Sequence, residues 1–181
     1  MRTVLLTVFS IFLSLSLFGC SSSTSKSGSG NDQVPRTTED TAPGMEGYVV
    51  DQRDGGILVV DNVPKNYGAT GGVEEFYNAI WFSYDQKDVA IGQKVQVWFN
   101  EVLESYPGQS TAEKLRILSA PKPAEANMNE AEAIRRALEE PRTDLPGVLV
   151  IKAATYDETS DQWSITIKQG DDEWVVQIDD K

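Results

Sequence analysis

A proline-rich break at Pro121-Lys122-Pro123-Ala124 divides this sequence into two segments with different hydrophobic periods. Two prolines within three residues remove two amide donors, so neither a helix interior nor a central strand can run through them. Before the break, apolar and polar residues alternate as they do in strands. Directly after it, apolar residues recur with the spacing of a helix. The break therefore predicts two folded units, residues 45–120 and residues 124–181.

The segment 45–120 contains short strand patterns joined by turns that contain glycine. Two apolar runs, Tyr48–Val50 and Ile57–Val60, flank Gly55-Gly56, which supplies the positive φ of a tight hairpin turn. Further strands are expected at residues 79–84, 93–100 and 114–119, with a short helical turn at 73–77. Five short strands and one small helical element favour a closed or nearly closed barrel, because closure removes exposed strand edges. We therefore expect an OB-like β-barrel.

The segment 124–181 begins with a helix and continues with strands. Asn129 can cap a helix from Glu130 to about Glu140, and Pro141 ends it. Three strands are expected at residues 148–156, 163–168 and 174–179. The fold class is thus mainly β with an α+β C-terminal part, in which one helix covers a three-stranded meander. About sixty residues is near the lower limit for independent stability. Packing against the first unit would add stability, and the sequence leaves open whether the two units pack together.

The N-terminus has the pattern of a secretory signal, residues 1–19: Arg2 precedes an apolar run. Alternatively, that run could anchor the chain as an uncleaved helix. Its end, Leu17-Phe18-Gly19-Cys20, resembles the bacterial lipoprotein box. The resemblance implies cleavage after Gly19 and a diacylglyceryl group on Cys20, and two acyl chains suffice for stable anchoring. Residues 20–44 are then a lipidated Cys and a disordered Ser/Gly-rich tether, because few of their side chains can be buried.

The charged residues exclude several classes of function. The chain of 181 residues has 16 Lys and Arg against 28 Asp and Glu, one Cys and no His. Without His it has no Ser-His-Asp triad, no Cys-His dyad and no His-ligated zinc. Cleavage after Gly19 removes only Arg2 among charged residues and takes the net charge from −12 to −13. Such acidity argues against nucleic acid as a partner and favours a basic or uncharged one.

Four blocks of residues 45–120 resemble the YobA-like domain of unknown function found in lipoproteins of Bacillus and its relatives. The blocks are Gly47-Tyr48-Val49-Val50, Ala79-Ile80-Trp81-Phe82-Ser83, residues 91–98 and Glu104-Ser105-Tyr106-Pro107-Gly108-Gln109. The last block is the most specific. The resemblance implies a Gram-positive envelope lipoprotein with a small β-barrel and no assigned activity.

The second unit resembles a PepSY-type module in two places. They are the helix pattern at residues 130–138 and the strand Trp174-Val175-Val176-Gln177-Ile178-Asp179. The resemblance implies an extracytoplasmic protein, and some members of that family restrain peptidases. Residues 124–181 are therefore expected to form a small αβββ PepSY-like domain.

Carboxylates are the abundant reactive groups. A glycosidase needs two of them across a cleft, and Glu74, Glu75, Glu101 and Glu104 lie near predicted loops, but we interpret them as solvated loop charges. Two Asp-rich turns, Asp51/Asp54 and Asp157/Glu158/Asp161, could bind calcium, although neither matches an EF-hand loop. Asp commonly forms turns through its own backbone hydrogen bonds, which is our preferred interpretation. We therefore expect no catalytic residue, no metal and no cofactor.

Two aromatic residues are the candidate binding residues. If Val95 and Val97 face the interior of the barrel, Trp98 faces outward. The alternative is that Trp98 packs against the second unit or the Tyr106 loop. Tyr106 lies in a Tyr-Pro-Gly turn. Aromatic side chains with a polar tip can stack on peptides or sugars. We expect a non-enzymatic envelope lipoprotein that presents a protein- or glycan-binding surface outside the cell. The alternatives are an inhibitor of an extracytoplasmic peptidase and a carboxylate hydrolase.

Overall fold

The computed structural model describes residues 42–53, 55–84, 88–139 and 146–181. The signal segment, Cys20, the tether up to residue 41, Asp54 and Pro141 lie outside these residues. The elements in chain order are β1 (Met45–Arg53), β2 (Gly56–Asp61), the 3-10 helix η1 (Gly68–Thr70), β3 (Ala79–Ser83), β4 (Lys94–Trp98), β5 (Gly108–Thr111), β6 (Lys114–Ile117), α1 (Glu130–Glu139), β7 (Leu149–Asp157), β8 (Gln162–Gln169) and β9 (Asp172–Asp179). No helix of the described residues is long and apolar enough to cross a membrane.

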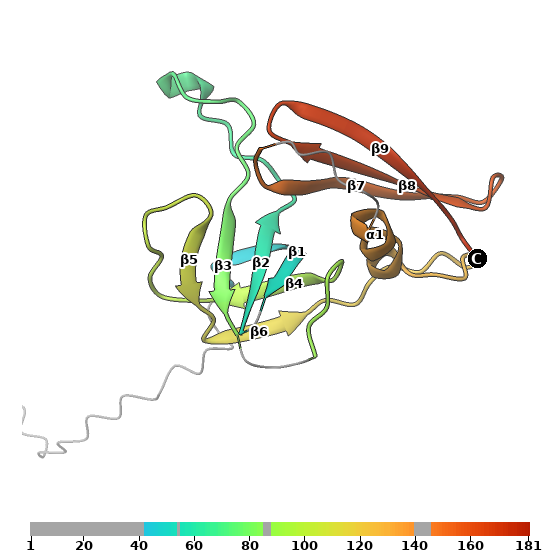
Figure 1. Ribbon diagram of the computed structural model, residues 1–181, viewed down its shortest axis with the longest axis horizontal. Helices are drawn as coiled ribbons and strands as arrows, with labels where there is room; N and C mark the ends of the chain where they lie inside the picture. The colour runs from blue at the N-terminus through green and yellow to red at the C-terminus, as the bar shows by residue number, and fades with distance from the viewer. Residues whose placement is uncertain (1–41, 54, 85–87, 140–145) are drawn as a thin grey trace, which may run out of the picture. The chain divides into compact units, whose positions relative to one another are not determined.

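Strands β1 to β6 form one mixed sheet with the order β5-β3-β2-β1-β4-β6 (Figure 1). The predicted hairpin is confirmed: β1 and β2 are antiparallel, and Gly55 has a φ of +74°. The predicted helical turn at residues 73–77 is wrong, because the only short helix of this region lies at Gly68–Thr70 in the described chain. There the Asn66 side chain accepts a hydrogen bond from the Gly68 amide (2.8 Å) and starts the turn earlier.

The mainly β fold class is confirmed, but a closed barrel is not found among the described residues. Strands β5 and β6 are the two edges of the sheet, and no ladder joins them. They are successive parts of one run: the Ala112 amide still bonds to Ser83 of β3, whereas the Glu113 amide bonds to Trp98 of β4. Each part therefore pairs with a different strand, β5 parallel to β3 and β6 antiparallel to β4.

The six-stranded sheet encloses an apolar core of its own. Its buried members come from β1 to β4 and from the loop before β4: Met45, Val49, Ile57, Val59, Ile80, Phe82, Val89, Val95 and Val97. Alternate residues of each strand contribute, because successive side chains point to opposite faces of a strand. The side chains on the opposite face of β1, β2 and β3 are therefore outside this core and face another part of the chain.

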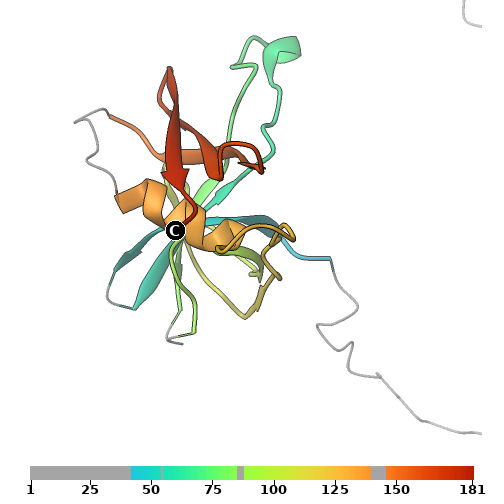
Figure 2. The ribbon, with the colours of Figure 1, turned by 90° about the vertical axis from the view of Figure 1, so that its right-hand side faces the viewer.

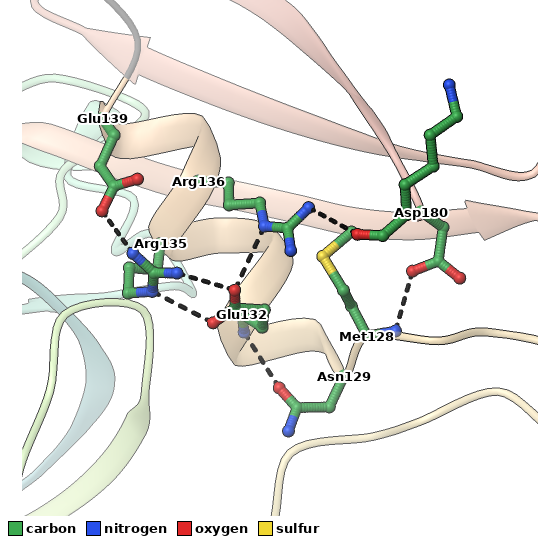
Figure 3. Close-up of polar contacts among 8 residues, drawn as sticks. Met128, Asn129, Glu132, Arg135, Arg136, Glu139 and Asp180 are labelled. Atoms are coloured by element: carbon green, nitrogen blue, oxygen red, sulfur yellow. Dashed lines mark hydrogen bonds and ion pairs between the residues drawn. The ribbon is translucent and has the colours of Figure 1, made fainter.

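The C-terminal part has the predicted order, one helix and then the antiparallel sheet β7-β8-β9. Asn129 caps α1 by accepting a hydrogen bond from the Glu132 amide (2.9 Å), as Figure 3 shows. The Glu132 side chain bonds to Arg135 and Arg136. The Asp180 carboxylate is 1% exposed and accepts hydrogen bonds from the Asn127 and Met128 amides just before the helix. The last strand is thereby fastened to the start of α1.

The two sheets and the helix share a second core. It joins the free face of the first sheet (Tyr48, Val50, Leu58, Val60) to buried residues of α1 and of β7, β8 and β9. Figure 2 shows α1, in orange, beneath the strands of the three-stranded sheet, in red. Tyr48 donates a hydrogen bond to Glu130 of α1 (2.6 Å), and burial followed by this bond raises the pKa of Tyr48 above its usual range. The second unit therefore packs against the first through this shared core.

Candidate functional site

Tyr106, one of the two predicted binding residues, lies in the loop 99–107 between β4 and β5. Its side chain is 55% exposed. Its hydroxyl donates a hydrogen bond to the carbonyl oxygen of Tyr77 (3.2 Å), and its ring centroid is 5.7 Å from that of Phe76. Burial of the hydroxyl raises the pKa of Tyr106. The ring is thus held in one position by its tip while one side remains open to solvent.

Beside this ring is a groove of about 380 Å³, which we call the Tyr106 groove. Its lining includes Tyr106 and Pro107 of the loop, Trp81 of β3, Val148, and Leu149 at the start of β7. The Arg53 guanidinium lies 4.2 Å from the centroid of the Trp81 ring. Such stacking fixes the indole and places a cation at the edge of the groove. The volume is within the range of ordinary ligand sites, and the lining combines apolar side chains with the polar side chains of Asp51, Arg53 and Gln169.

A smaller cavity of about 190 Å³ adjoins the Tyr106 groove and shares Tyr106, Gly147 and Val148 with it. Glu75 is one of the residues that line this smaller cavity. Its two carboxylate oxygens pair with Lys152 (2.9 Å) and Lys168 (3.0 Å), and Tyr77 donates a hydrogen bond to it (2.6 Å). The Tyr77 hydroxyl and then the two lysines lower the pKa of Glu75 to about 2. This ionised network fastens loop 62–78 to β7 and β8.

Most of the exposed apolar side chains lie on the two loops beside the groove. Of the seven large hydrophobic residues that are exposed in the described chain, six belong to loops 62–78 and 99–107: Val63, Tyr67, Val73, Val102, Leu103 and Tyr106. An edge-to-face contact joins Tyr67 to Phe76, and Phe76 contacts Tyr106. Loop 62–78 extends beyond the ends of β2 and β3 (Figure 1). Apolar side chains gathered in this way mark interaction surfaces more often than scattered ones do.

Trp98, the other predicted binding residue, does not join this site. It lies on the face of β4 opposite to Val95 and Val97 but is only 7% exposed. Lys114 and Arg116 of β6 lie over its ring, at 5.0 and 5.4 Å from the centroid. Trp98 therefore lies on the expected face of β4. Its indole ring is nevertheless covered by side chains of the neighbouring strand, β6. Trp98 therefore has little surface for stacking on a ligand.

The remaining candidates have other roles or positions. Asp157 accepts a hydrogen bond from the Thr159 amide (2.8 Å) and Asp161 one from the Tyr156 hydroxyl (2.8 Å), so both carboxylates are used within their turn. Within the described ranges, no group of three or more Asp, Glu, Cys or His side chains could hold a metal ion. Glu75 belongs to the ion network. Glu74, Glu101 and Glu104 are exposed loop residues, as expected.

Sequence reasoning did not single out Trp81 or the start of β7 as parts of the site. Ile80 and Phe82 are buried on one face of β3, so alternation does place Trp81 on the other face. That signal was present in the sequence. The contribution of Val148 and Leu149 had no local signal, because it depends on how the second sheet packs on the first.

The comparisons with known proteins bear on the first unit. Residues 46–119 match a family described as a protein of unknown function (DUF3221). Curated proteins and solved structures give no match. The matched range contains Trp81, Tyr106 and both apolar loops, whereas Val148 and Leu149 lie beyond it. Residues 46–119 are therefore similar to a domain of unknown function, as the sequence led us to expect.

Proposed function

We propose that this protein binds an extended, apolar segment of an extracytoplasmic protein in the Tyr106 groove. The observation that carries the proposal is the half-exposed Tyr106 ring in the lining of the groove. Its own loop and loop 62–78, which lines the adjoining cavity, hold six exposed hydrophobic side chains. An aromatic ring fixed by its hydroxyl needs little ordering on binding, which makes it a good contact residue. Arg53 in the groove and the Glu75 network in the adjoining cavity add polar contacts.

The chemistry of the partner follows from charge. The body is strongly acidic, so a partner with basic or uncharged residues around its apolar segment suits it best. Nucleic acid does not suit it. No catalytic residue is part of the proposal, and neither is a cofactor.

The location that we propose is the outer face of the cell membrane of a Gram-positive bacterium. The Leu17-Phe18-Gly19-Cys20 box supports lipidation at Cys20, and the tether that follows would let the body sample a shell on the order of 27 Å from its anchor. Replacing Cys20→Ser should move the protein from the membrane fraction to the medium. Retention of this variant in the membrane would instead favour an uncleaved helical anchor.

Within the family of unknown function, we propose the YobA-like group for residues 45–120, on the strength of the block Glu104–Gln109. We also propose that the first sheet is a distorted relative of an OB-fold. Three pairings support this: β1 pairs with both β2 and β4, and β5 runs parallel to β3. The sheet differs from a closed OB barrel because its two edge strands, β5 and β6, do not pair with each other.

Capture of binding partners tests the proposed function. The lipidated protein would be crosslinked in native envelopes and isolated as wild type, as Tyr106→Ala and as Val175→Ala. Val175 is also an exposed hydrophobic residue, but it belongs to β9 and to neither of the two loops. A specific protein should be captured at least about tenfold less by Tyr106→Ala, since a central aromatic anchor contributes 2 kcal/mol or more. Equal capture by all three proteins would refute the role of the groove.

One class of partner has separate support. The order of one helix and three strands in residues 130–179 agrees with the PepSY-type resemblance, and such modules restrain peptidases in some proteins. If the partner is a peptidase, the mature protein should inhibit it, and Tyr106→Ala should weaken the inhibition. If the mature protein inhibits none of a panel of secreted peptidases, the proposal that the partner is a peptidase is eliminated.

A further inference from the structure

A second groove, of about 570 Å³, lies along β5 and is lined almost entirely by polar side chains. Ser83, Ser110 and Thr111 contribute hydroxyls, Asn100 and Gln109 contribute amides, and Glu101 and Glu113 contribute carboxylates. We propose that this polar groove binds an uncharged, hydroxyl-rich oligosaccharide. The proposal is independent of the Tyr106 groove.

The charges of the lining select the class of ligand. The lining contains no Lys or Arg, and its two carboxylates would repel phosphate, sulfate or uronic acid groups. It contains no aromatic ring on which a nucleobase could stack. A ligand with many hydroxyls can donate to the carboxylates and exchange hydrogen bonds with the amides and hydroxyls. Neutral sugars have this chemistry.

The polar side chains are arranged before a ligand binds. The Asn100 amide donates a hydrogen bond to the Glu113 carboxylate, and the Ser110 hydroxyl donates one to the carbonyl oxygen of Glu101 (2.6 Å). Ser83 and Thr111 are register partners on the parallel strands β3 and β5, so their hydroxyls lie on one face at about the 4.8 Å strand spacing. Rigid strands therefore hold a row of hydrogen-bonding groups, and the ordering cost on binding is small.

Apolar contact is available at the margin of the polar groove. Leu103 lines it and is 66% exposed, and a bridge between Leu103 and Gln109 holds it there. A sugar ring has a C–H face as well as hydroxyls, so a polar row beside an exposed apolar side chain matches both of its surfaces.

Titration followed by amide NMR tests the proposal with the chain 21–181. The probes are three tetrasaccharides: neutral β-1,4-linked N-acetylglucosamine, its deacetylated cationic form and anionic galacturonic acid. The neutral probe should shift the amides of Ser83, Gln109 and Thr111. The double variant Ser83→Ala/Thr111→Val should weaken its binding at least about fivefold, as expected for lost hydrogen bonds.

Two variants serve as controls. Thr155→Val removes an exposed strand hydroxyl on β7 and should leave sugar binding unchanged. Val175→Ala, which shortens an exposed apolar side chain on β9, should also leave it unchanged. The proposal is overturned if the neutral probe shifts none of these amides at tens of millimolar, if only a charged probe binds, or if the double variant titrates like the wild type.

Discussion

Glu75 fixes, through charge, the position of loop 62–78, which lines the cavity beside the Tyr106 groove. Its carboxylate is half-buried and bonds to Tyr77, Lys152 and Lys168, which holds loop 62–78 on the second sheet. Lys152 also pairs with Glu173 (2.7 Å), so four charged side chains form one network. Exposed pairs contribute little singly, but networks with good geometry contribute more.

Replacing Glu75→Gln should lower the free energy of unfolding at pH 7 by about 1 kcal/mol, measured by urea denaturation. The folded-state pKa of Glu75, about 2, is below the usual glutamate value of 4.5, so its contribution to stability is complete above pH 4.5. It is lost as the pH falls from there towards 2. The difference between wild type and variant should therefore shrink towards pH 2. Glu74→Gln, at the exposed neighbouring position, is the control, and an equal effect of both changes would contradict the network.

Among the elements, α1 depends on a close approach to the loop before β4. Gly92 has a φ of +91°, and a Cβ atom there would lie 2.2 Å from the carbonyl oxygen of Ala131 in the helix. Gly92→Ala should therefore displace α1 and lower the free energy of unfolding by about 2 kcal/mol or more, measured by thermal or urea denaturation. Gly71→Ala is the matched control, because Gly71 has a φ of +79° but nothing within 4 Å. Equal losses would mean that backbone strain alone matters.

The elements that could be predicted are those with local signals. The Gly55-Gly56 hairpin, the Asn129 cap and the three C-terminal strands each follow from turn residues, capping or alternation within a few positions. Strand β5 was missed because Gln109-Ser110-Thr111 has no apolar alternation and its partner is a parallel strand. For the site, the Tyr-Pro-Gly turn identified Tyr106. The burial of Trp98 depends on Lys114 and Arg116 of another strand, which alternation within β4 does not reveal.

At the scale of the whole molecule, the shared core couples the two sheets. Tyr48, Leu58 and Val60 of the first sheet are buried with Ile134, Trp163 and Ile165 of the C-terminal part. The folded region should therefore unfold in a single transition, with the same midpoint by tryptophan fluorescence and by far-UV circular dichroism. A fragment that ends at residue 120 should expose these side chains and aggregate. Two separate transitions would instead indicate independent domains.

The central claim is that the Tyr106 groove contacts a protein partner outside the cell. The most direct measurement is photocrosslinking with p-azidophenylalanine, which preserves the aromatic ring, placed at Tyr106 or, as a control, at Tyr156 on β7. Irradiation of intact cells should give one discrete adduct from position 106, and Trp81→Ala in the same chain should reduce its yield. The absence of an adduct from position 106, or the same adduct from position 156, would contradict the account.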